Sequence, residues 1–284
     1  MPETPRTIAD RRRDFHRLHD AGCFAIPNPW DIGSARFLQG LGFKALATTS
    51  SGFAWSRGRP DNGLGRDAVL AHVAELVAAS DLPVNADFES GFAVDAVGVG
   101  ESVRLLLETG VAGLSIEDST GDAARPLFAL DDAVARITAA RRAIDRSGGD
   151  ALLVGRAECF LVGRPDLDET ITRLKAYAGA GADCLYAPGI HSREQIAAVV
   201  AAVAPKPVNL LVGGASELTM ADIAALGVRR VSVGGALARA AWGGFLRAAR
   251  ELADAGTFGG FADAASGKEL NAFFGGAPTK PAKS

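Results

Sequence analysis

The stretch GVAGLSIED, from Gly110 to Asp118, decides how this chain folds. It begins with a glycine that closes a helix-like segment, continues with small and apolar residues, and ends on two acidic ones. Glycine is typical of a helix C-terminus, because it adopts the left-handed backbone conformation at no steric cost. The stretch therefore predicts a helix end that leads directly into a buried strand. The same pattern occurs in GFKALATTS (42–50), GADCLYAPG (181–189) and GVRRVSVGG (227–235).

Four further apolar runs complete a set of eight predicted strands. They begin at Cys23 (CFAIPN), Leu82 (LPVNADF), Ala151 (ALLVGRA) and Lys206 (KPVNLLV). Amphipathic segments such as Arg66–Ala79 alternate with these runs. Near-continuous apolar strands that alternate with helices are typical of a parallel sheet covered by helices. Eight such units in a chain of this length favour an α/β fold of the TIM type, a (β/α)8 barrel.

An open doubly wound sheet is the alternative to the barrel. Such a sheet usually carries a G-x-G-x-x-G turn after its first strand, and the segment IPNPWDIG (26–33) is not such a turn. We therefore predict a single barrel domain over residues 23–274. An N-terminal helix is expected within residues 1–22, and a disordered tail over residues 275–284.

Composition and charge exclude several classes of partner. The 284 residues are 48% hydrophobic, and 30 basic residues stand against 33 acidic ones, a net charge of −3. Acidic residues interrupt the densest basic run, Arg11–Arg17, so no surface is basic enough to predict nucleic-acid binding. No apolar run approaches the length of a membrane span, and the N-terminus lacks the apolar core of a signal peptide.

The three cysteines, Cys23, Cys159 and Cys184, lie far apart in the chain. Each lies in an apolar stretch, and none has a second cysteine or a histidine at metal-ligand spacing. This pattern predicts buried free thiols in a reducing compartment. Together with the composition, it predicts a cytoplasmic protein that binds neither membrane nor nucleic acid.

Most polar residues that follow the predicted strands are acidic. The active site of a TIM barrel lies at the carboxyl ends of its strands. Those ends carry Asn28 and Asp31, Thr49 to Ser51, Asp87 and Glu89, Glu117 and Asp118, Arg156 and Glu158, and Asn209. Several carboxylates and one arginine are therefore expected at a single mouth of the barrel.

An acidic cluster of this kind needs a positive counter-charge, because like charges raise each other's pKa. Carboxylates without histidine or cysteine suit Mg²⁺ or Mn²⁺. The alternative is that strand-end acids cap the following helices. Capping accounts for Asp31 or Asp118, but it accounts poorly for Asp87, Glu89 and Glu117 together, so we predict a divalent metal site.

Three other features of the mouth have two interpretations each. Arg156 pairs with the acids, binds a carboxylate or phosphonate of a substrate through two parallel hydrogen bonds, or does both. The small-residue turn Thr48–Phe53 offers backbone N–H groups and hydroxyls that suit an anion, although such turns are common. Trp30 either lines the pocket or packs against the rim of the barrel.

Five short segments, in this order, resemble the isocitrate lyase / phosphoenolpyruvate mutase superfamily. They are NPWDIGSAR (28–36) with the small-residue turn that follows it, GRPD (58–61), DFESGF (87–92), IEDS (116–119) and GRAE (155–158). The segment DFESGF is similar to the family's metal motif D-x-D-x-G-[YF], with Glu89 in place of the second aspartate. The resemblance covers roughly residues 24–235.

The resemblance implies a metal site. Asp87 would bind Mg²⁺ (or Mn²⁺) directly, and Asp61, Glu89 and Glu117 would hold its water shell. Members of this superfamily work through a Mg²⁺-chelated enolate of a 2-oxo acid. A metal next to the developing enolate charge stabilises it.

The resemblance also implies the substrate contacts. Ser50 and Ser51 would bind the substrate carboxylate through their backbone N–H groups, and Arg156 would bind its second anionic group. Asn209 and Trp30 are further expected substrate contacts.

The segment after the fourth strand departs from the family pattern. Isocitrate and methylisocitrate lyases carry K-[KR]-C-G-H there, and the mutases carry a lysine and an asparagine. Residues 117–134 of this chain contain no cysteine, lysine, histidine or asparagine. Gly121 and Pro126 suit hinges of a mobile lid, and Arg125 either closes over an anion or is a solvated surface residue. The usual isocitrate lyase reaction is therefore not expected, and no proton donor is identified.

Several functions follow from these expectations. The first is a Mg²⁺-dependent lyase that cleaves or forms a C–C bond of a small 2-oxo or 2-hydroxy acid, with Arg156, Glu117, Asp61 and Arg125 as catalytic candidates. The second is P–C bond chemistry on a phosphonopyruvate-like substrate. The third is a barrel that binds a phosphorylated ligand at the glycine segments Leu210–Ser216 and Ser232–Ala238 without a metal. A non-catalytic binding protein is the fourth.

The resemblance implies an oligomer as well. The family forms tetramers in which a C-terminal helix is exchanged between neighbouring barrels. The segment Gly260–Phe274 predicts a turn and a short helix that aligns Leu270, Phe273 and Phe274 for burial. We therefore expect a dimer or tetramer, and the sequence leaves open whether the helix docks on its own chain or on a neighbour.

Overall fold

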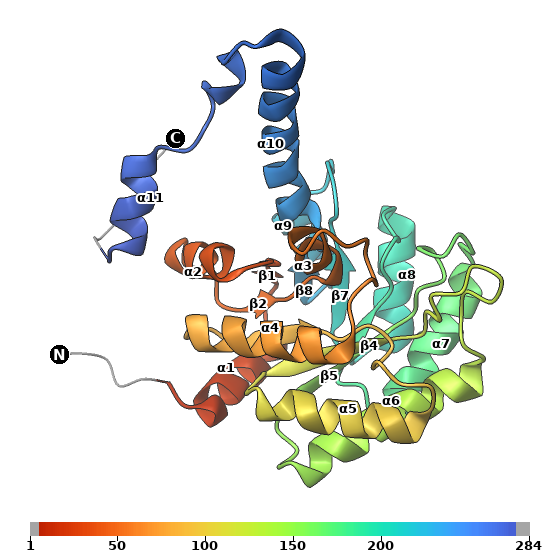
Figure 1. The fold of residues 1–284 in the computed structure, drawn as a ribbon. Helices are drawn as coiled ribbons and strands as arrows, with labels where there is room; N and C mark the ends of the chain where they lie inside the picture. Colours follow the sequence, from red (N-terminus) through yellow and green to blue (C-terminus); the bar gives the residue numbers. More distant parts are fainter. Residues whose placement is uncertain (1–5, 277–284) are drawn as a thin grey trace.

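The strands form one parallel barrel. The computed structural model describes residues 6–276, and in this part of the chain eight strands pair in the order β1-β8-β7-β6-β5-β4-β3-β2 (Figure 1). The backbone N–H of Ala47 donates to Pro27 O at 3.0 Å and links the two ends of the sheet. The predicted (β/α)8 barrel is confirmed. The strands are β1 (Phe24–Ile26), β2 (Leu46–Ala47), β3 (Val84–Asp87), β4 (Gly113–Glu117), β5 (Leu152–Arg156), β6 (Cys184–Tyr186), β7 (Val208–Leu211) and β8 (Arg230–Ser232).

Helices alternate with the strands and cover the outside of the barrel (Figure 1). The first of them, α1, closes the end at which the strands begin, because its Phe15 is fully buried and its Arg12 donates to Val111 O just before β4. The helices are α1 (Ile8–Asp20), α2 (Ile32–Gly40), α3 (Ser50–Ser56), α4 (Arg66–Ala79), α5 (Ala96–Glu108), α6 (Leu130–Arg146), α7 (Leu167–Gly179), α8 (Arg193–Val203), α9 (Met220–Ala225), α10 (Ala236–Ala255), η1 (Gly259–Phe261) and α11 (Gly267–Phe274).

The glycines that predicted the fold stand where helices end. Gly42, Gly110, Gly181 and Gly227 each lie two residues after the last residue of a helix, and their φ angles are 88°, 84°, 104° and 87°. A side chain is strained in this region of φ, whereas glycine is not. The sequence pattern and the backbone therefore agree at all four helix-to-strand connections.

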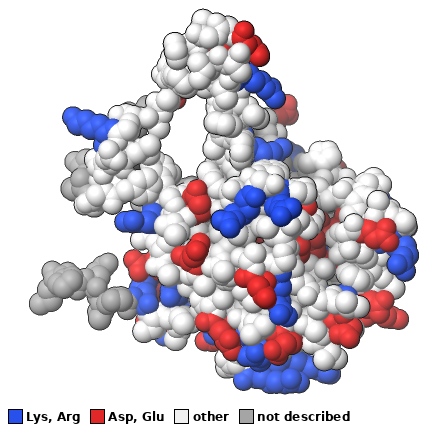
Figure 2. Space-filling view, viewed as in Figure 1, with Lys and Arg blue, Asp and Glu red and all other residues white. Residues whose placement is uncertain are grey.

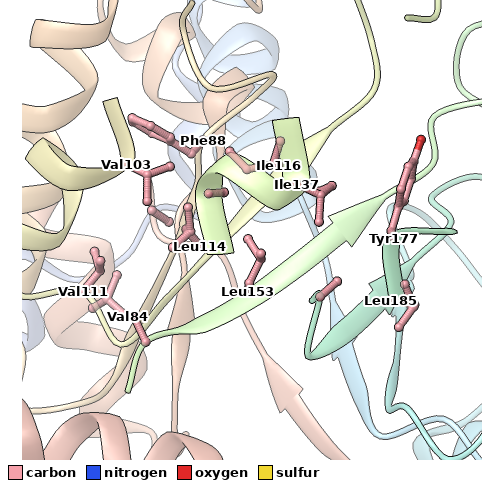
Figure 3. Packing of buried hydrophobic residues seen from close by; sticks show 14 of the residues in the cluster. Val84, Phe88, Val103, Val111, Leu114, Ile116, Ile137, Leu153, Tyr177 and Leu185 are labelled. Carbon is pink, nitrogen blue, oxygen red and sulfur yellow. The ribbon is translucent and has the colours of Figure 1, made fainter. Parts of the chain in front are cut away.

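Two apolar layers hold the barrel together. The larger layer lies between the strands and the surrounding helices, and Figure 3 shows part of it, with Val84, Leu114 and Leu153 from strands facing Val103 and Ile137 from helices. The smaller layer fills the inside of the barrel and includes residues of α1, β1, β5 and β6. Strand residues buried on both faces are the reason that the strands appear as continuous apolar runs in the sequence.

His72 on α4 makes the stability of the fold depend on pH. Its ring stacks on Phe53 with centroids 3.7 Å apart, its Nε2 is buried without a hydrogen-bond partner, and burial lowers its pKa to about 4. The unfolded chain takes up a proton at this histidine below its ordinary pKa of about 6.5, whereas the folded protein does not. The contribution of neutral His72 to the free energy of unfolding is therefore complete above pH 6.5 and is lost as the pH falls toward 4. In total it amounts to roughly 3 kcal/mol, since one pKa unit corresponds to 1.36 kcal/mol.

We expect the urea midpoint of the wild type to fall more between pH 7 and pH 5 than that of His72→Asn, because the variant has no proton to take up. The exposed His191 provides the control, and His191→Asn should keep the wild-type pH dependence. An equal fall in His72→Asn and the wild type would contradict this account.

The C-terminal part of the chain forms an arm. Helix α10 leaves the barrel after β8, η1 marks the far end of the arm, and α11 returns to lie beside α2 (Figure 1). Figure 2 shows an opening between this arm and the barrel, and few charged side chains on the arm. The helix predicted near the C-terminus is present, but in this single chain none of its residues is fully buried: Phe273 packs on Phe37 of α2, while Leu270 and Phe274 stay 38% and 39% exposed. Most of the predicted tail, residues 277–284, lies outside the described residues.

Other sequence expectations can be compared with the fold. All three cysteines are free, as predicted; Cys159 and Cys184 are buried and Cys23 is partly exposed. None of the helices between residues 6 and 276 combines the length and apolar character needed to cross a membrane.

Candidate active site

A cavity of about 150 Å³ opens at the carboxyl ends of the strands. All eight strands, or the loops that directly follow them, contribute to its wall. Five of the residues predicted from the sequence line it: Ser50, Ser51, Asp61, Asp87 and Arg156. The structure thus brings together residues that are more than 100 positions apart in the sequence, at the end of the barrel where the site was predicted.

Arg156, the last residue of β5, binds three carboxylates at once. Its Nη1 lies 2.6 Å from Asp87 Oδ1, its Nη2 lies 3.1 Å from Glu117 Oε2, and its Nε donates to Glu158 Oε1 at 2.9 Å. Burial opposes the charge of Arg156, but Glu158, Glu117 and Asp87 outweigh this effect and raise its pKa well above the usual value. Of the two interpretations from the sequence, pairing with the acids is therefore realised in the structure.

The Thr48 hydroxyl and the Ser50 N–H fix Asp87 from the other side. The Thr48 hydroxyl accepts a hydrogen bond from the Asp87 N–H at 2.8 Å, and the Ser50 N–H donates to Asp87 Oδ2 at 3.2 Å. The segment predicted as a turn is the first turn of α3, with the Thr49 side chain as its N-cap. Its Ser50 N–H points at the Asp87 carboxylate, and N–H groups at the start of a helix suit an anionic ligand.

The remaining predicted acids lie close enough to one another to interact. Burial, and then the charges of Asp87 and Asp61, raise the pKa of Glu89 to about 8. Burial, and then the charge of Asp87, raise the pKa of Asp61. Burial also raises the pKa of Glu117 well above its usual value, with Arg156 opposing and the neighbouring carboxylates adding to the effect. One arginine therefore does not compensate this group of acids.

This donor set fits a divalent cation with few direct protein ligands. Among residues 6–276, no three His, Cys, Asp or Glu side chains stand close enough to bind an ion together. Mg²⁺ commonly keeps several water ligands and binds through one or two carboxylates. Asp87 as the direct ligand, with Asp61, Glu89 and Glu117 around its water shell, matches that preference. Glu89 has a φ of 46°, a strained backbone conformation of the kind that occurs at functional sites.

Five predicted residues do not line the cavity: Glu89 and Glu117, whose carboxylates interact with those of the lining, and Arg125, Trp30 and Asn209. Arg125 has a side chain that is 87% exposed, and its nearest acidic partner is Asp122 at 3.7 Å on the same loop. Trp30 is partly buried behind the first turn of α3, where its Cβ lies against Gly52. Asn209 is fully buried on β7, where it bonds neighbouring side chains. Their predicted roles stay predictions.

Sequence reasoning missed two charged or polar groups on the inner face of the barrel. Arg230 on β8 is 2% exposed, lines the cavity and has no carboxylate within 4.0 Å in the described part of the chain. Tyr186 on β6 is 8% exposed and lines the cavity as well. Successive side chains of a strand alternate between its faces, so the spacing of Arg230 and Ser232 could have indicated that both point inward.

A buried network next to the cavity fixes the ends of β4 and β5. Asp118 is 1% exposed and accepts hydrogen bonds from the Tyr177 hydroxyl at 2.5 Å, from Arg173 Nη1 at 3.1 Å and from the Glu158 N–H at 2.8 Å. It therefore holds Glu158, which in turn holds Arg156. The sequence suggested Asp118 as a helix cap, and the structure shows it as this buried acceptor instead.

Comparison with known proteins assigns the family. Residues 15–253 match the family model for phosphoenolpyruvate phosphomutase. An oxaloacetate decarboxylase from Paraburkholderia xenovorans is 33% identical over 232 residues, which cover 78% of this chain and 74% of that protein.

Two solved structures have the same fold. A Burkholderia cenocepacia protein, provisionally called a lyase/mutase, superimposes with a TM-score of 0.91 at 51% identity and covers 94% of this chain and 97% of that one. An oxaloacetate acetylhydrolase in complex with its product oxalate superimposes with a TM-score of 0.83 at 27% identity, with 94% of each chain covered. The chain belongs to the phosphoenolpyruvate phosphomutase family, within the isocitrate lyase / phosphoenolpyruvate mutase superfamily.

Proposed function

We propose that this protein is a Mg²⁺-dependent lyase that cleaves a C–C bond of a small 2-oxo or 2-hydroxy carboxylic acid. Family membership supports C–C cleaving chemistry in general. The observation that carries the finer proposal is the position of Asp87, which lies between the Ser50 N–H and the Arg156 guanidinium at one cavity wall. An acidic ligand for a cation and N–H donors for a carboxylate therefore stand side by side.

Different residues of the cavity would bind the substrate carboxylate, the departing group and the cation. The N–H groups at the start of α3 would bind the substrate carboxylate, and Arg156 would attract negative charge as it develops on the departing part of the substrate. When bound at Asp87, Mg²⁺ supplies positive charge to the oxygens of the enolate. Asp61, Glu89 and Glu117 would hold the water molecules of the cation. Burial and neighbouring carboxylates raise the pKa of all three, which supports a site that an added positive charge would stabilise.

The charges of the cavity favour C–C over P–C chemistry. A phosphonate carries more negative charge than a carboxylate and needs additional cations. The two arginines that line the cavity are Arg156, which already binds three carboxylates, and Arg230. The related oxaloacetate decarboxylase and oxaloacetate acetylhydrolase are named for C–C cleavage of oxaloacetate. Oxaloacetate and 2-methylmalate are therefore the first substrates to test.

The test measures pyruvate released from oxaloacetate and from 2-methylmalate with a lactate dehydrogenase coupling assay, and oxalate released from oxaloacetate by chromatography. With Mg²⁺ we expect product release by the wild type to exceed the rate without enzyme. With EDTA, or with Asp87→Asn, we expect release to stay at the rate without enzyme. Phosphonopyruvate is tested as a substrate in parallel, and its turnover is measured as phosphate release and as conversion to phosphoenolpyruvate. Turnover of phosphonopyruvate with no release from either carbon substrate would contradict the proposal.

We also propose that the arm joins two copies of this chain and that the enzyme works in the cytoplasm, where its three free thiols stay reduced. Helix α10 exposes Trp242 (38%), Phe245 (59%) and Leu252 (43%), and Phe258 beyond it is 66% exposed. So many apolar side chains on one element are typical of an interface between subunits.

We expect light scattering after size exclusion to give a dimer or tetramer of the 29.2 kDa chain. Phe245→Glu should lower the mass toward one chain, because a charge placed in an apolar interface is costly. Asp67→Lys, a charge change on an exposed side chain of α4, should leave the mass unchanged. A wild type that is monomeric at micromolar concentration would refute the proposal.

A further inference from the structure

The cavity contains few groups that can donate a proton. Its titratable lining residues in the described part of the chain are Asp61, Asp87, Arg156, Tyr186 and Arg230. Arginine stays protonated in proteins, and the two aspartates belong to the proposed metal site. The segment after β4, residues 117–134, has no cysteine, lysine or histidine. Tyr186 is therefore the remaining titratable side chain that can exchange a proton with a ligand in this cavity.

A chain of buried polar groups leads from Arg230 through Asn209 to Ser232, which lines the same cavity as Tyr186. Arg230 Nε donates to Asn209 Oδ1 at 2.8 Å, and Asn209 Nδ2 donates to Ser232 Oγ at 3.0 Å. Because Ser232 Oγ accepts from Asn209, the Ser232 hydroxyl proton is directed elsewhere. Ser232 and Tyr186 line the same cavity, and the Ser232 side chain favours the ionised form of the Tyr186 hydroxyl. Arg230, Asn209 and Ser232 are at most 5% exposed, so the chain is shielded from solvent.

The surroundings of Tyr186 suit an acid. Burial raises the pKa of Tyr186 to about 12, so it carries its proton at neutral pH. The phenolate left after proton transfer is stabilised by the Arg156 guanidinium, whose central carbon lies 5.0 Å from the Tyr186 ring centroid, and by the Ser232 hydroxyl. A group that is protonated before the step and stabilised after it meets the requirements for general acid catalysis.

We propose that Tyr186 is the proton donor to the carbon of the enolate, and that Ser232, Asn209 and Arg230 orient its hydroxyl. This inference rests on the proposed function. In the step, the Tyr186 O–H bond breaks, the electron pair of the enolate C=C bond forms a new C–H bond at C3, and the 2-oxo group is restored. The phenolate then regains a proton from solvent. The reverse step removes a proton from the methyl group of pyruvate.

The reverse step can be measured without knowledge of the substrate. Pyruvate is incubated in deuterated water with enzyme and Mg²⁺, and loss of the methyl proton signal is followed by NMR. Oxalate affinity in the presence of Mg²⁺ is measured by titration calorimetry on the same samples, as a readout that does not depend on turnover. The variant is Tyr186→Phe, which keeps the ring. The control is Tyr177→Phe, which removes the hydroxyl of the other tyrosine of the chain, a buried residue outside the cavity.

We expect the wild type and Tyr177→Phe to exchange the methyl protons. Tyr186→Phe should exchange them at least roughly 100-fold more slowly, and its oxalate affinity should equal that of the wild type. Exchange by Tyr186→Phe at the wild-type rate would overturn the inference. A wild type that binds oxalate with Mg²⁺ but does not exchange pyruvate would overturn it too, while leaving the proposed function standing. Absence of both oxalate binding and exchange in the wild type would refute the proposed function itself.

Discussion

Arg156→Met is expected to destabilise the protein by roughly 3–5 kcal/mol at pH 8, the range typical of a buried ion pair that loses one partner. Arg156 is 12% exposed and is the cation shared by Asp87, Glu117 and Glu158, which are no more than 17% exposed. Methionine fills a similar volume but leaves three buried carboxylates without a positive charge. The loss of stability should therefore come from electrostatics and not from a cavity.

The pH dependence of this loss separates the two causes. Without Arg156 the folded protein can relieve repulsion by protonating Glu117 and Glu158, so the folded pKa values of these two groups rise further above the unfolded value of about 4.5. A carboxyl group whose pKa is higher in the folded than in the unfolded protein lowers the free energy of unfolding as the pH rises from the unfolded pKa through the folded pKa. The difference between wild type and variant should consequently be largest at pH 8 and shrink toward pH 5.

Urea unfolding at both pH values measures this difference. Arg193→Met is the matched control, because Arg193 pairs with Asp222 at the surface with 53% of its side chain exposed. Surface pairs contribute about 0–1 kcal/mol, so the control should change little at either pH. A loss in Arg156→Met that is the same at pH 5 and pH 8 would contradict the electrostatic account.

Asp118→Ala is expected to have the second large effect, a loss of roughly 3–5 kcal/mol. The substitution removes the acceptor for the Tyr177 hydroxyl, the Glu158 N–H and Arg173, and leaves Arg173 with Glu169 as its acidic partner. Because Glu158 holds Arg156, oxalate binding should weaken in the same variant. Both effects are measured by urea unfolding and titration calorimetry.

Tyr177→Phe separates the network from its single hydrogen bonds. It removes one donor to Asp118 and leaves the other two, so we expect it to cost about 1 kcal/mol, the usual net value of one hydrogen bond, and to leave oxalate affinity unchanged. If Asp118→Ala is no less stable than Tyr177→Phe, Asp118 does not hold the ends of β4 and β5 as described.

The sequence predicts the fold and much of the site because both depend on local patterns. Glycines such as Gly110 and Gly227 mark helix ends by a backbone requirement that a single residue meets. The position of Asp87 and Arg156 at strand ends follows from the barrel, since the carboxyl ends of all its strands meet at one face.

Other features depend on contacts that no local pattern contains. The three-way pairing of Arg156 and the buried position of Arg230 follow from which side chains meet across the barrel. The exposure of Arg125 depends on how the segment after β4 lies in space. The pattern of apolar residues on α10 predicts an amphipathic helix, but not that many of its apolar side chains stay exposed in the single chain.

The central claim is that the cavity binds a divalent cation and an enolate, and oxalate tests it most directly because its two carboxylate groups imitate the oxygens of a pyruvate enolate. Titration calorimetry of Mg²⁺, and then of oxalate in its presence, is carried out on the wild type and on Asp87→Ala. The account predicts oxalate binding by the wild type that requires Mg²⁺ and that is lost in Asp87→Ala. Oxalate binding that is equally tight in Asp87→Ala, or no binding by the folded wild type, would contradict it.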